Sequence, residues 1–171
     1  LIDKSENIPQ GPTVSINQGQ TAQNRTYQDL LKDKADEFNF EQLARAELYR
    51  VSLEGEKRLW KENAMYRSVS FSPDGEYVMV TTIERPFSYI VPYYRFPSTS
   101  IVYDKQGAQV KKILEVPLTE DLPKGFMAVR KGMRSLSWRS DQAATLVYAK
   151  ALDGGDPEQE ADYRDEVFQW K

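Results

Sequence analysis

The sequence predicts an all-β fold, namely a partial β-propeller of four-stranded antiparallel blades behind an extended N-terminal arm. Two observations carry this prediction. From residue 44 onward, short runs rich in aromatic and β-branched residues alternate with turns of Gly, Pro, Asp and Ser. In addition, residues 135–141 repeat the pattern of residues 68–74 at a spacing of 67 residues. A repeat of this kind indicates two successive copies of one β-unit.

The N-terminal part differs from the rest of the chain. Residues 1–26 are polar and show neither a helical nor a strand period, so we expect an extended arm. Beyond it, Leu30, Leu31 and Phe38 fit one face of a short helix, and Asp29 near its start suits the helix dipole. We therefore divide the chain into an arm with a short helix, residues 1–43, and propeller blades, residues 44–171.

The propeller region is predicted to hold one complete blade and parts of two others. A first hairpin resembles the last two strands of a preceding blade and comprises residues 46–51 and 57–60. A complete blade follows, with strands at residues 68–71, 77–83, 100–103 and 109–114. The second copy contributes three strands: the first begins the segment 135–141, which repeats residues 68–74, and the others are residues 144–149 and 166–170. The fourth strand of that copy is missing.

The predicted blades are too few to close a propeller, since propellers typically have about four to eight. A blade that ends on its third strand presents an unpaired edge. The chain also begins with Leu1 rather than with Met. We therefore expect it to be a piece of a longer polypeptide.

The composition excludes several kinds of site. The chain contains no His and no Cys, so it cannot form a Ser-His-Asp triad, a Cys nucleophile or a Cys-based metal site. A formal net charge of −3 weighs against nucleic-acid and membrane-surface binding. No apolar run approaches the roughly 20 residues that span a bilayer. We predict no cofactor, and we favour a periplasmic or extracellular location, although the lack of Cys does not decide the compartment.

Several segments carry a family resemblance. The strand-turn-strand of residues 70–78 resembles propeller repeats of the prolyl oligopeptidase family and of TolB-like proteins. More specific segments resemble the propeller of glutamyl endopeptidases, which are serine peptidases of the prolyl oligopeptidase clan; they are residues 25–31, 85–97, 128–130 and 151–157. The resemblance covers most of the chain from Arg25 onward.

The resemblance implies a parent enzyme that cleaves peptides after acidic residues. Its partner would be a C-terminal α/β-hydrolase domain of the same polypeptide, with the nucleophile and its Asp and His beyond Lys171. This chain has no Gly-x-Ser-x-Gly motif, so we assign it no catalytic residue. Its implied function is to gate the access of peptides to the separate catalytic domain.

Two other functions stay open. A TolB-like propeller that binds or scaffolds, with no enzyme attached, fits the same repeat and the same lack of catalytic residues. A carboxylate-based hydrolase is the weaker alternative, because a paired-carboxylate site needs a cleft that a sequence does not reveal. The sequence of the polypeptide beyond Lys171 decides between a propeller segment of a peptidase and a TolB-like module.

Two loops contain candidate substrate-binding residues. Residues 84–97 are rich in Arg, Tyr and Pro, and a guanidinium there could hold a carboxylate through two hydrogen bonds. The alternative is a loop that prolines stiffen and whose aromatic side chains pack on the neighbouring blade. A second basic group lies at residues 124–139. It either contacts the substrate or forms a rim that faces solvent or another domain. The candidates are Arg85, Tyr93, Arg95, Arg130 and Arg134.

Two further features favour structural roles. The acidic loop at residues 153–162 has oxygen ligands of the kind that calcium prefers, but it lacks the EF-hand spacing, and we predict no metal site. Trp60, Trp138 and Trp170 stand at or near the ends of predicted strands, so we expect them to pack between blades.

Overall fold

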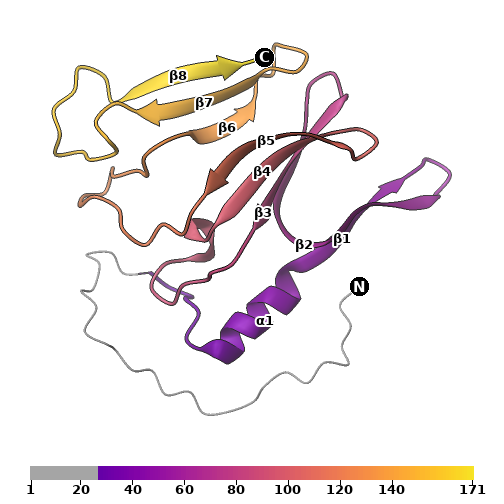
Figure 1. Cartoon of the computed structure of the whole chain (residues 1–171), viewed down its shortest axis with the longest axis horizontal. Helices are drawn as coiled ribbons and strands as arrows, with labels where there is room; N and C mark the ends of the chain where they lie inside the picture. Colours follow the sequence, from indigo (N-terminus) through magenta and orange to yellow (C-terminus); the bar gives the residue numbers. More distant parts are fainter. Residues whose placement is uncertain (1–26) are drawn as a thin grey trace.

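The computed structural model describes residues 27–171, so the arm predicted for residues 1–26 lies outside the described part of the chain. The described chain is mostly β, with one α-helix and two antiparallel sheets that do not close into a ring (Figure 1). In chain order the elements are α1 (Lys34–Ala44), β1 (Arg45–Val51), β2 (Lys57–Phe71), β3 (Tyr77–Ile83), the 3-10 helix η1 (Tyr93–Arg95), β4 (Ser98–Asp104), β5 (Gln109–Val116), β6 (Arg134–Trp138), β7 (Leu146–Ala151) and β8 (Asp165–Trp170).

The predicted short helix exists, but it begins later than expected. Asp33 is its N-cap, and the Asp33 carboxylate accepts hydrogen bonds from the backbone N–H groups of Ala35 and Asp36. This cap satisfies two of the N–H groups that a helix start leaves unpaired. The prediction that Leu30 and Leu31 lie on the helix is therefore wrong, because both residues precede the cap.

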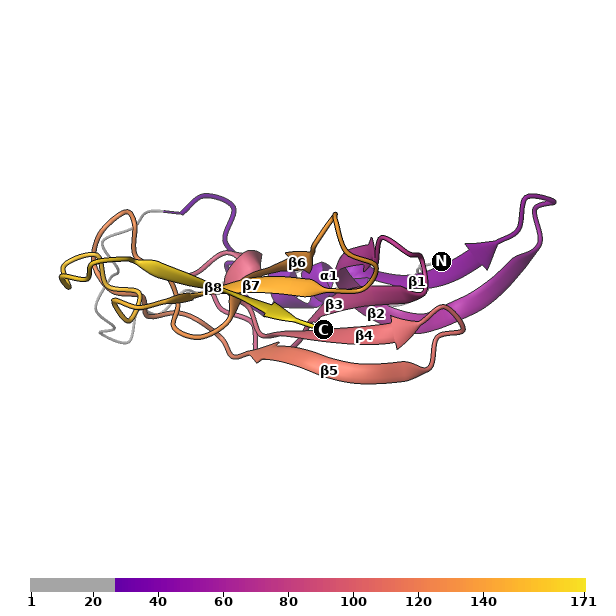
Figure 2. The same cartoon turned by 90° about the horizontal axis from the view of Figure 1, so that it is seen from above.

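The first sheet has the strand order β1-β2-β3-β4-β5. The four-stranded antiparallel meander predicted from residues 68–114 is confirmed. The predicted hairpin of residues 46–51 and 57–60 is confirmed by the antiparallel pairing of β1 with β2, but it is not separate from the meander, because residues 57–60 and 68–71 belong to the single 15-residue strand β2. No Gly or Pro interrupts residues 61–67, so the strand continues through a bulge between Tyr66 and Ser68. Figure 2 shows the β1–β2 hairpin extending beyond the other strands.

The second sheet has the order β6-β7-β8 and confirms the three strands predicted for the second copy of the repeat. An apolar core lies between the two sheets, where Met79, Val102 and Leu146 are buried. Trp138 and Trp170 pack against this core, and Trp60 packs edge to face on Tyr103, with 5.9 Å between the ring centroids. Trp138 and Trp170 therefore pack between the two sheets, whereas Trp60 packs within the first sheet, where its contact is with β4 of the same sheet.

A second core fixes α1 to the first sheet. Its buried members come from β2, from β3 and from the loop between β3 and β4, and they are Met65, Ile83, Val91 and Phe96. Phe40 of α1 packs edge to face on both Phe87 and Phe96, at 5.3 Å and 5.7 Å. The loop that holds candidate binding residues is thus anchored to the body of the molecule.

Candidate functional site

Two long loops lie side by side at one end of the sheets, and we call them together the rim (Figure 1). They are residues 84–97, between β3 and β4, and residues 117–133, between β5 and β6. The Thr119 N–H donates to the Arg95 carbonyl at 3.0 Å, and the Ser88 hydroxyl donates to the Glu120 carboxylate at 2.6 Å. These bonds join the two loops that carry four of the five candidate residues.

Arg85 is engaged by two carboxylates of α1. Its guanidinium donates to Glu37 and Glu41, and the Nε atom lies 2.8 Å from Glu41 Oε2. Glu37 also accepts from Lys34 and Tyr89, and only 6% of its surface is exposed. Burial alone would raise the pKa of Glu37, but hydrogen bonds from Tyr89, Lys34 and Arg85 outweigh it and hold the pKa at about 2. Arg85 therefore attaches the loop to the helix.

The tip of the first loop has a buried side and an exposed side. Val91 and Phe96 are buried and anchor it. Between them, the rings of Tyr93 and Tyr94 are exposed and meet edge to face, with centroids 5.9 Å apart. The structure thus presents Tyr93 at the surface, where it can contact a ligand.

Arg95 has no carboxylate partner within residues 27–171. Its guanidinium lies over the Tyr27 ring, 5.2 Å from the ring centroid. The Arg95 Nη1 atom and the Tyr27 hydroxyl are both buried without a hydrogen-bond partner among the described residues. Buried polar groups ordinarily have such partners, so Arg95 keeps one N–H donor that residues 27–171 do not pair.

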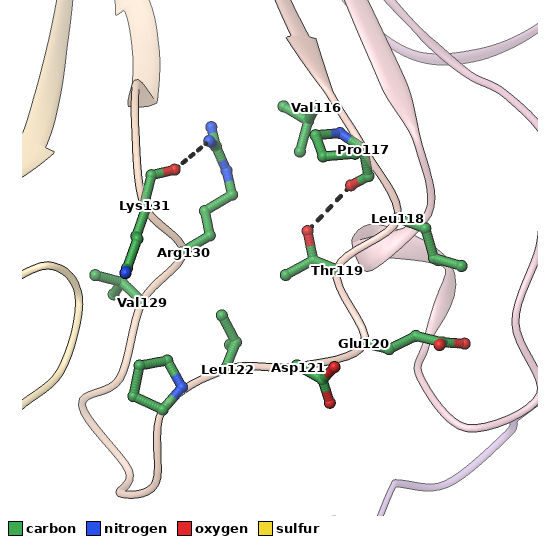
Figure 3. A pocket seen from close by; sticks show the side chains of 11 residues that line it. Val116, Pro117, Leu118, Thr119, Glu120, Asp121, Leu122, Val129, Arg130 and Lys131 are labelled. Atoms are coloured by element: carbon green, nitrogen blue, oxygen red, sulfur yellow. Dashed lines mark hydrogen bonds between the residues drawn. The ribbon is translucent and has the colours of Figure 1, made fainter.

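A pocket of about 420 Å³ lies within the rim, between residues 116–123 and residues 129–131 (Figure 3). Most of its wall is apolar. Its charged groups are Glu120 and Asp121 on one side and Arg130 and Lys131 on the other. Figure 3 shows the Arg130 side chain extending between the two segments that form the walls. The pocket is open to solvent and combines apolar side chains with two acidic and two basic ones.

Arg130 and Arg134 form a basic group beside this pocket. Arg130 donates to the main-chain carbonyls of Lys131 and Met133 rather than to a carboxylate. Burial lowers the pKa of Arg130, and the neighbouring charges of Arg134 and Arg67 lower it further. Arg134 pairs with Asp165, while its Nε atom is buried without a partner in the described chain. Within residues 27–171, Arg130 is therefore left without a carboxylate partner.

The acidic loop contacts the rim. The Asp153 carboxylate accepts from the Arg164 Nε at 2.7 Å and from the Gly155 N–H at 2.8 Å. The hydrogen bond from Arg164 lowers the pKa of Asp153. Gly155 has a φ of +82°, and a Cβ there would lie 2.1 Å from the Val129 carbonyl oxygen, so only glycine fits. Within residues 27–171 no three acidic side chains gather in a metal-binding arrangement.

Sequence reasoning missed the groups that hold the rim in place. Glu37 and Glu41 are four residues apart and therefore share one face of α1, which was a readable signal for a cationic partner. The contact between Ser88 and Glu120 and the pair of Asp153 with Arg164 had no such signal.

No helix in the described region is both long and apolar enough to cross a bilayer.

The fold and the rim define a class: an open antiparallel β-module, built from a repeated strand-turn-strand unit, with a pocket of mixed charge at one end and no nucleophile–histidine pair. The chain is similar to two plant proteins, each with the name "Probable glutamyl endopeptidase, chloroplastic". The identity is 41% for the protein of Arabidopsis thaliana and 39% for that of Oryza sativa subsp. japonica, over 162 residues, or 94% of this chain.

The similarity covers only part of each relative, because the chain spans 17% of their length. No protein-family model matches the chain, and no solved structure matches it. The names of the relatives agree with the predicted resemblance to glutamyl endopeptidases. Membership of the wider prolyl oligopeptidase clan stays a prediction.

Proposed function

We propose that the chain is the non-catalytic propeller segment of a serine peptidase, in which it gates the access of peptides to a separate α/β-hydrolase domain. The observation that carries this proposal is the similarity to two proteins named glutamyl endopeptidases, of which the chain spans 17%. The lack of any histidine supports a non-catalytic role for the chain itself.

The arrangement of the sheets supports a propeller. Each copy of the repeat forms an antiparallel meander, and the second meander packs on the first through an apolar core. Successive meanders that stack face to face are the arrangement of propeller blades. In such a segment the rim would line the path of a peptide, and its fixed loops would exclude folded proteins.

The rim also supports a choice among the five candidate residues. We propose that Arg95 and Arg130 contact acidic peptides, because neither guanidinium has a carboxylate partner in the described chain. Tyr93 would offer a ring to the peptide, and Arg134 would add positive charge. Arg85 would act by positioning the loop, since a ligand would have to displace Glu37 and Glu41 from it.

The test uses the longer polypeptide that contains this segment and a panel of peptides with Glu, Asp, Gln or Pro before the scissile bond. A fluorophosphonate label identifies an active serine. Arg130→Gln should lower kcat/KM for the Glu peptide about tenfold and leave the Gln peptide unchanged, because a lost charge-assisted hydrogen bond is worth about 1.5 kcal/mol. Arg58→Gln is the control, since Arg58 lies exposed beside the β1–β2 turn. Equal loss for both peptides would contradict the proposed contact.

A TolB-like binding module is the second candidate function, favoured by the absence of catalytic residues from the chain. A polypeptide that does not react with the fluorophosphonate and cleaves no peptide would support it. The predicted periplasmic or extracellular location stays a prediction, as does the absence of nucleic-acid and membrane partners.

A further inference from the structure

The repeat carries an arginine at the same position in both of its copies. Residues 68–74 correspond to residues 135–141, so Arg67 of β2 corresponds to Arg134 of β6. Arg130, which lines the rim pocket, lies close enough to both for their charges to lower its pKa. We call Arg67, Arg130 and Arg134 the arginine cluster. The cluster thus takes members from both copies of the repeat.

The strand is irregular beside the arginine in each copy. In the first copy, Arg67 is the extra residue of the bulge between Tyr66 and Ser68. In the second copy, a bulge follows Arg134, and Ser135 within it has a φ of +55°, a value that few non-glycine residues adopt. Bulges redirect side chains out of the regular alternation of a strand and are frequent beside active sites. Both arginines therefore stand where the alternation is broken.

The arginine cluster has more positive charge than the described chain neutralises. Arg134 pairs with Asp165. Arg130 donates to main-chain carbonyls, and the exposed Arg67 side chain makes no hydrogen bond or ion pair with any residue from 27 to 171. Partial burial and the two neighbouring guanidinium groups disfavour the charge on Arg130. Two guanidinium groups are thus held near like charge without a carboxylate.

The acidic side chains of the rim pocket do not pair with the cluster. Glu120 accepts from the Ser88 hydroxyl, and Figure 3 shows the Glu120 carboxylate directed away from Arg130. Asp121 belongs to the same wall of the pocket as Glu120, and neither carboxylate forms an ion pair with Arg130. The guanidinium groups of Arg67 and Arg130 are therefore available to an anion from outside the described chain.

We propose that the arginine cluster binds a peptide with two acidic residues, in which Arg130 holds one carboxylate and Arg67 holds the other. This inference rests on the proposed function, because it takes the peptide from that function and adds a second acidic residue to it. Two carboxylates match the two guanidinium groups that lack one. Arginine suits both positions, because its planar group binds a carboxylate through two parallel hydrogen bonds.

The test uses the longer polypeptide that contains this segment and pairs of peptides that differ in one residue. Each peptide has Glu before the scissile bond and either Glu or Gln at one of the four preceding positions. Arg67→Gln removes the proposed second contact, and Arg67→Lys keeps the charge without the two parallel hydrogen bonds. Arg58→Gln is the matched control, since Arg58 belongs to the same strand and its side chain is 83% exposed.

We expect kcat/KM to be about tenfold higher for the best peptide with two Glu residues than for its Gln counterpart, because one charge-assisted contact is lost. Arg67→Gln should remove this preference, Arg67→Lys should keep part of it, and Arg58→Gln should keep all of it. A preference that survives Arg67→Gln would overturn the proposal, and so would the absence of any preference in the unsubstituted polypeptide.

Thermal unfolding separates binding from a structural role of Arg67. Because the Arg67 side chain has no ion pair in the described chain and repels Arg130, Arg67→Gln should leave the unfolding midpoint unchanged or raise it. A fall in the midpoint, together with an equal loss of kcat/KM for both peptides of a pair, would assign Arg67 to the structure and overturn the proposal.

Binding of a fluorescent peptide with two Glu residues, measured after fluorophosphonate treatment, separates this inference from the proposed function. A polypeptide that cleaves peptides, but whose binding and cleavage do not respond to Arg67→Gln, would refute this inference and leave the proposed function standing. Binding that Arg67→Gln weakens about tenfold, in a polypeptide that cleaves no peptide, would keep the site for two carboxylates and refute the proposed function.

Discussion

The two contacts that hold the molecule together differ in chemistry. The contact between the sheets is apolar, with Met79, Val102 and Leu146 buried in it. The contact between α1 and residues 84–97 adds an ionic cluster in which Glu37 and Glu41 receive Arg85. We therefore expect pH and salt to change the stability of the contact between α1 and the rim. The apolar contact between the sheets should respond to neither.

Leu146→Ala should give the largest loss of stability. Leu146 is 5% exposed between the sheets, and truncating such a side chain leaves a cavity that costs about 3 kcal/mol of unfolding free energy. Chemical denaturation at pH 7 and pH 5 should give the same loss, because no charge is involved. Val167→Ala, at an exposed position, should change the free energy by less than about 0.5 kcal/mol. A loss of unfolding free energy that depends on pH would contradict a purely apolar contact between the sheets.

Lowering the pH should weaken the attachment of α1. The pKa of Glu37 is about 2 in the folded chain, against an ordinary value of 4.5. Its contribution is complete above pH 4.5 and is lost as the pH falls from 4.5 toward 2. The contribution is on the order of 3 kcal/mol. Glu37→Gln should remove this part of the pH dependence in denaturation curves recorded across that range, and an unchanged slope would contradict the role of the cluster.

Arg85→Gln should cost about 2 kcal/mol at pH 7, because it leaves the buried Glu37 carboxylate with fewer donors. The loss should shrink as salt is added, since Arg85 is half exposed and its pairs are screened. Arg58→Gln serves as the matched control and should have almost no effect. A loss equal to that of the control would show that the rim does not depend on the cluster.

Ser88→Ala should have the smallest effect, about 1 kcal/mol, because it removes one hydrogen bond to Glu120 and one from the Ile90 N–H. Since the Glu120 bond joins the two loops of the rim, amide hydrogen exchange at Thr119 should accelerate. Unchanged exchange there would mean that other contacts hold the loops together.

Local patterns predicted most of the strands. The turn Ser72-Pro73-Asp74-Gly75 and the runs beside it led to the correct hairpin, in which the Ser72 hydroxyl accepts from the Tyr77 N–H. The same reasoning misjudged β2, because short windows show where strands exist but not whether two of them are continuous. It also placed the helix start too early, since Leu30 and Leu31 suggested an apolar face while the cap at Asp33 marked the true beginning.

The candidate site was predicted only as a set of residue types. Arg85 and Arg95 looked equivalent in the sequence, yet one is paired with two carboxylates and the other has none in the described chain. The partners of Arg85 are 44 and 48 residues away, so no local pattern could separate the two arginines.

By itself, the sequence determined the β-rich class, the repeated strand-turn-strand unit and the absence of a histidine-based catalytic site. These properties follow from composition and from contacts between neighbouring residues. Tertiary structure alone decided which arginines stay without a carboxylate and why Trp138 is covered while Phe71, its equivalent in the first copy, is exposed. The physical reason is that charge pairing and apolar burial depend on which distant segments meet, and the same residue pattern has a different environment in each copy of the repeat.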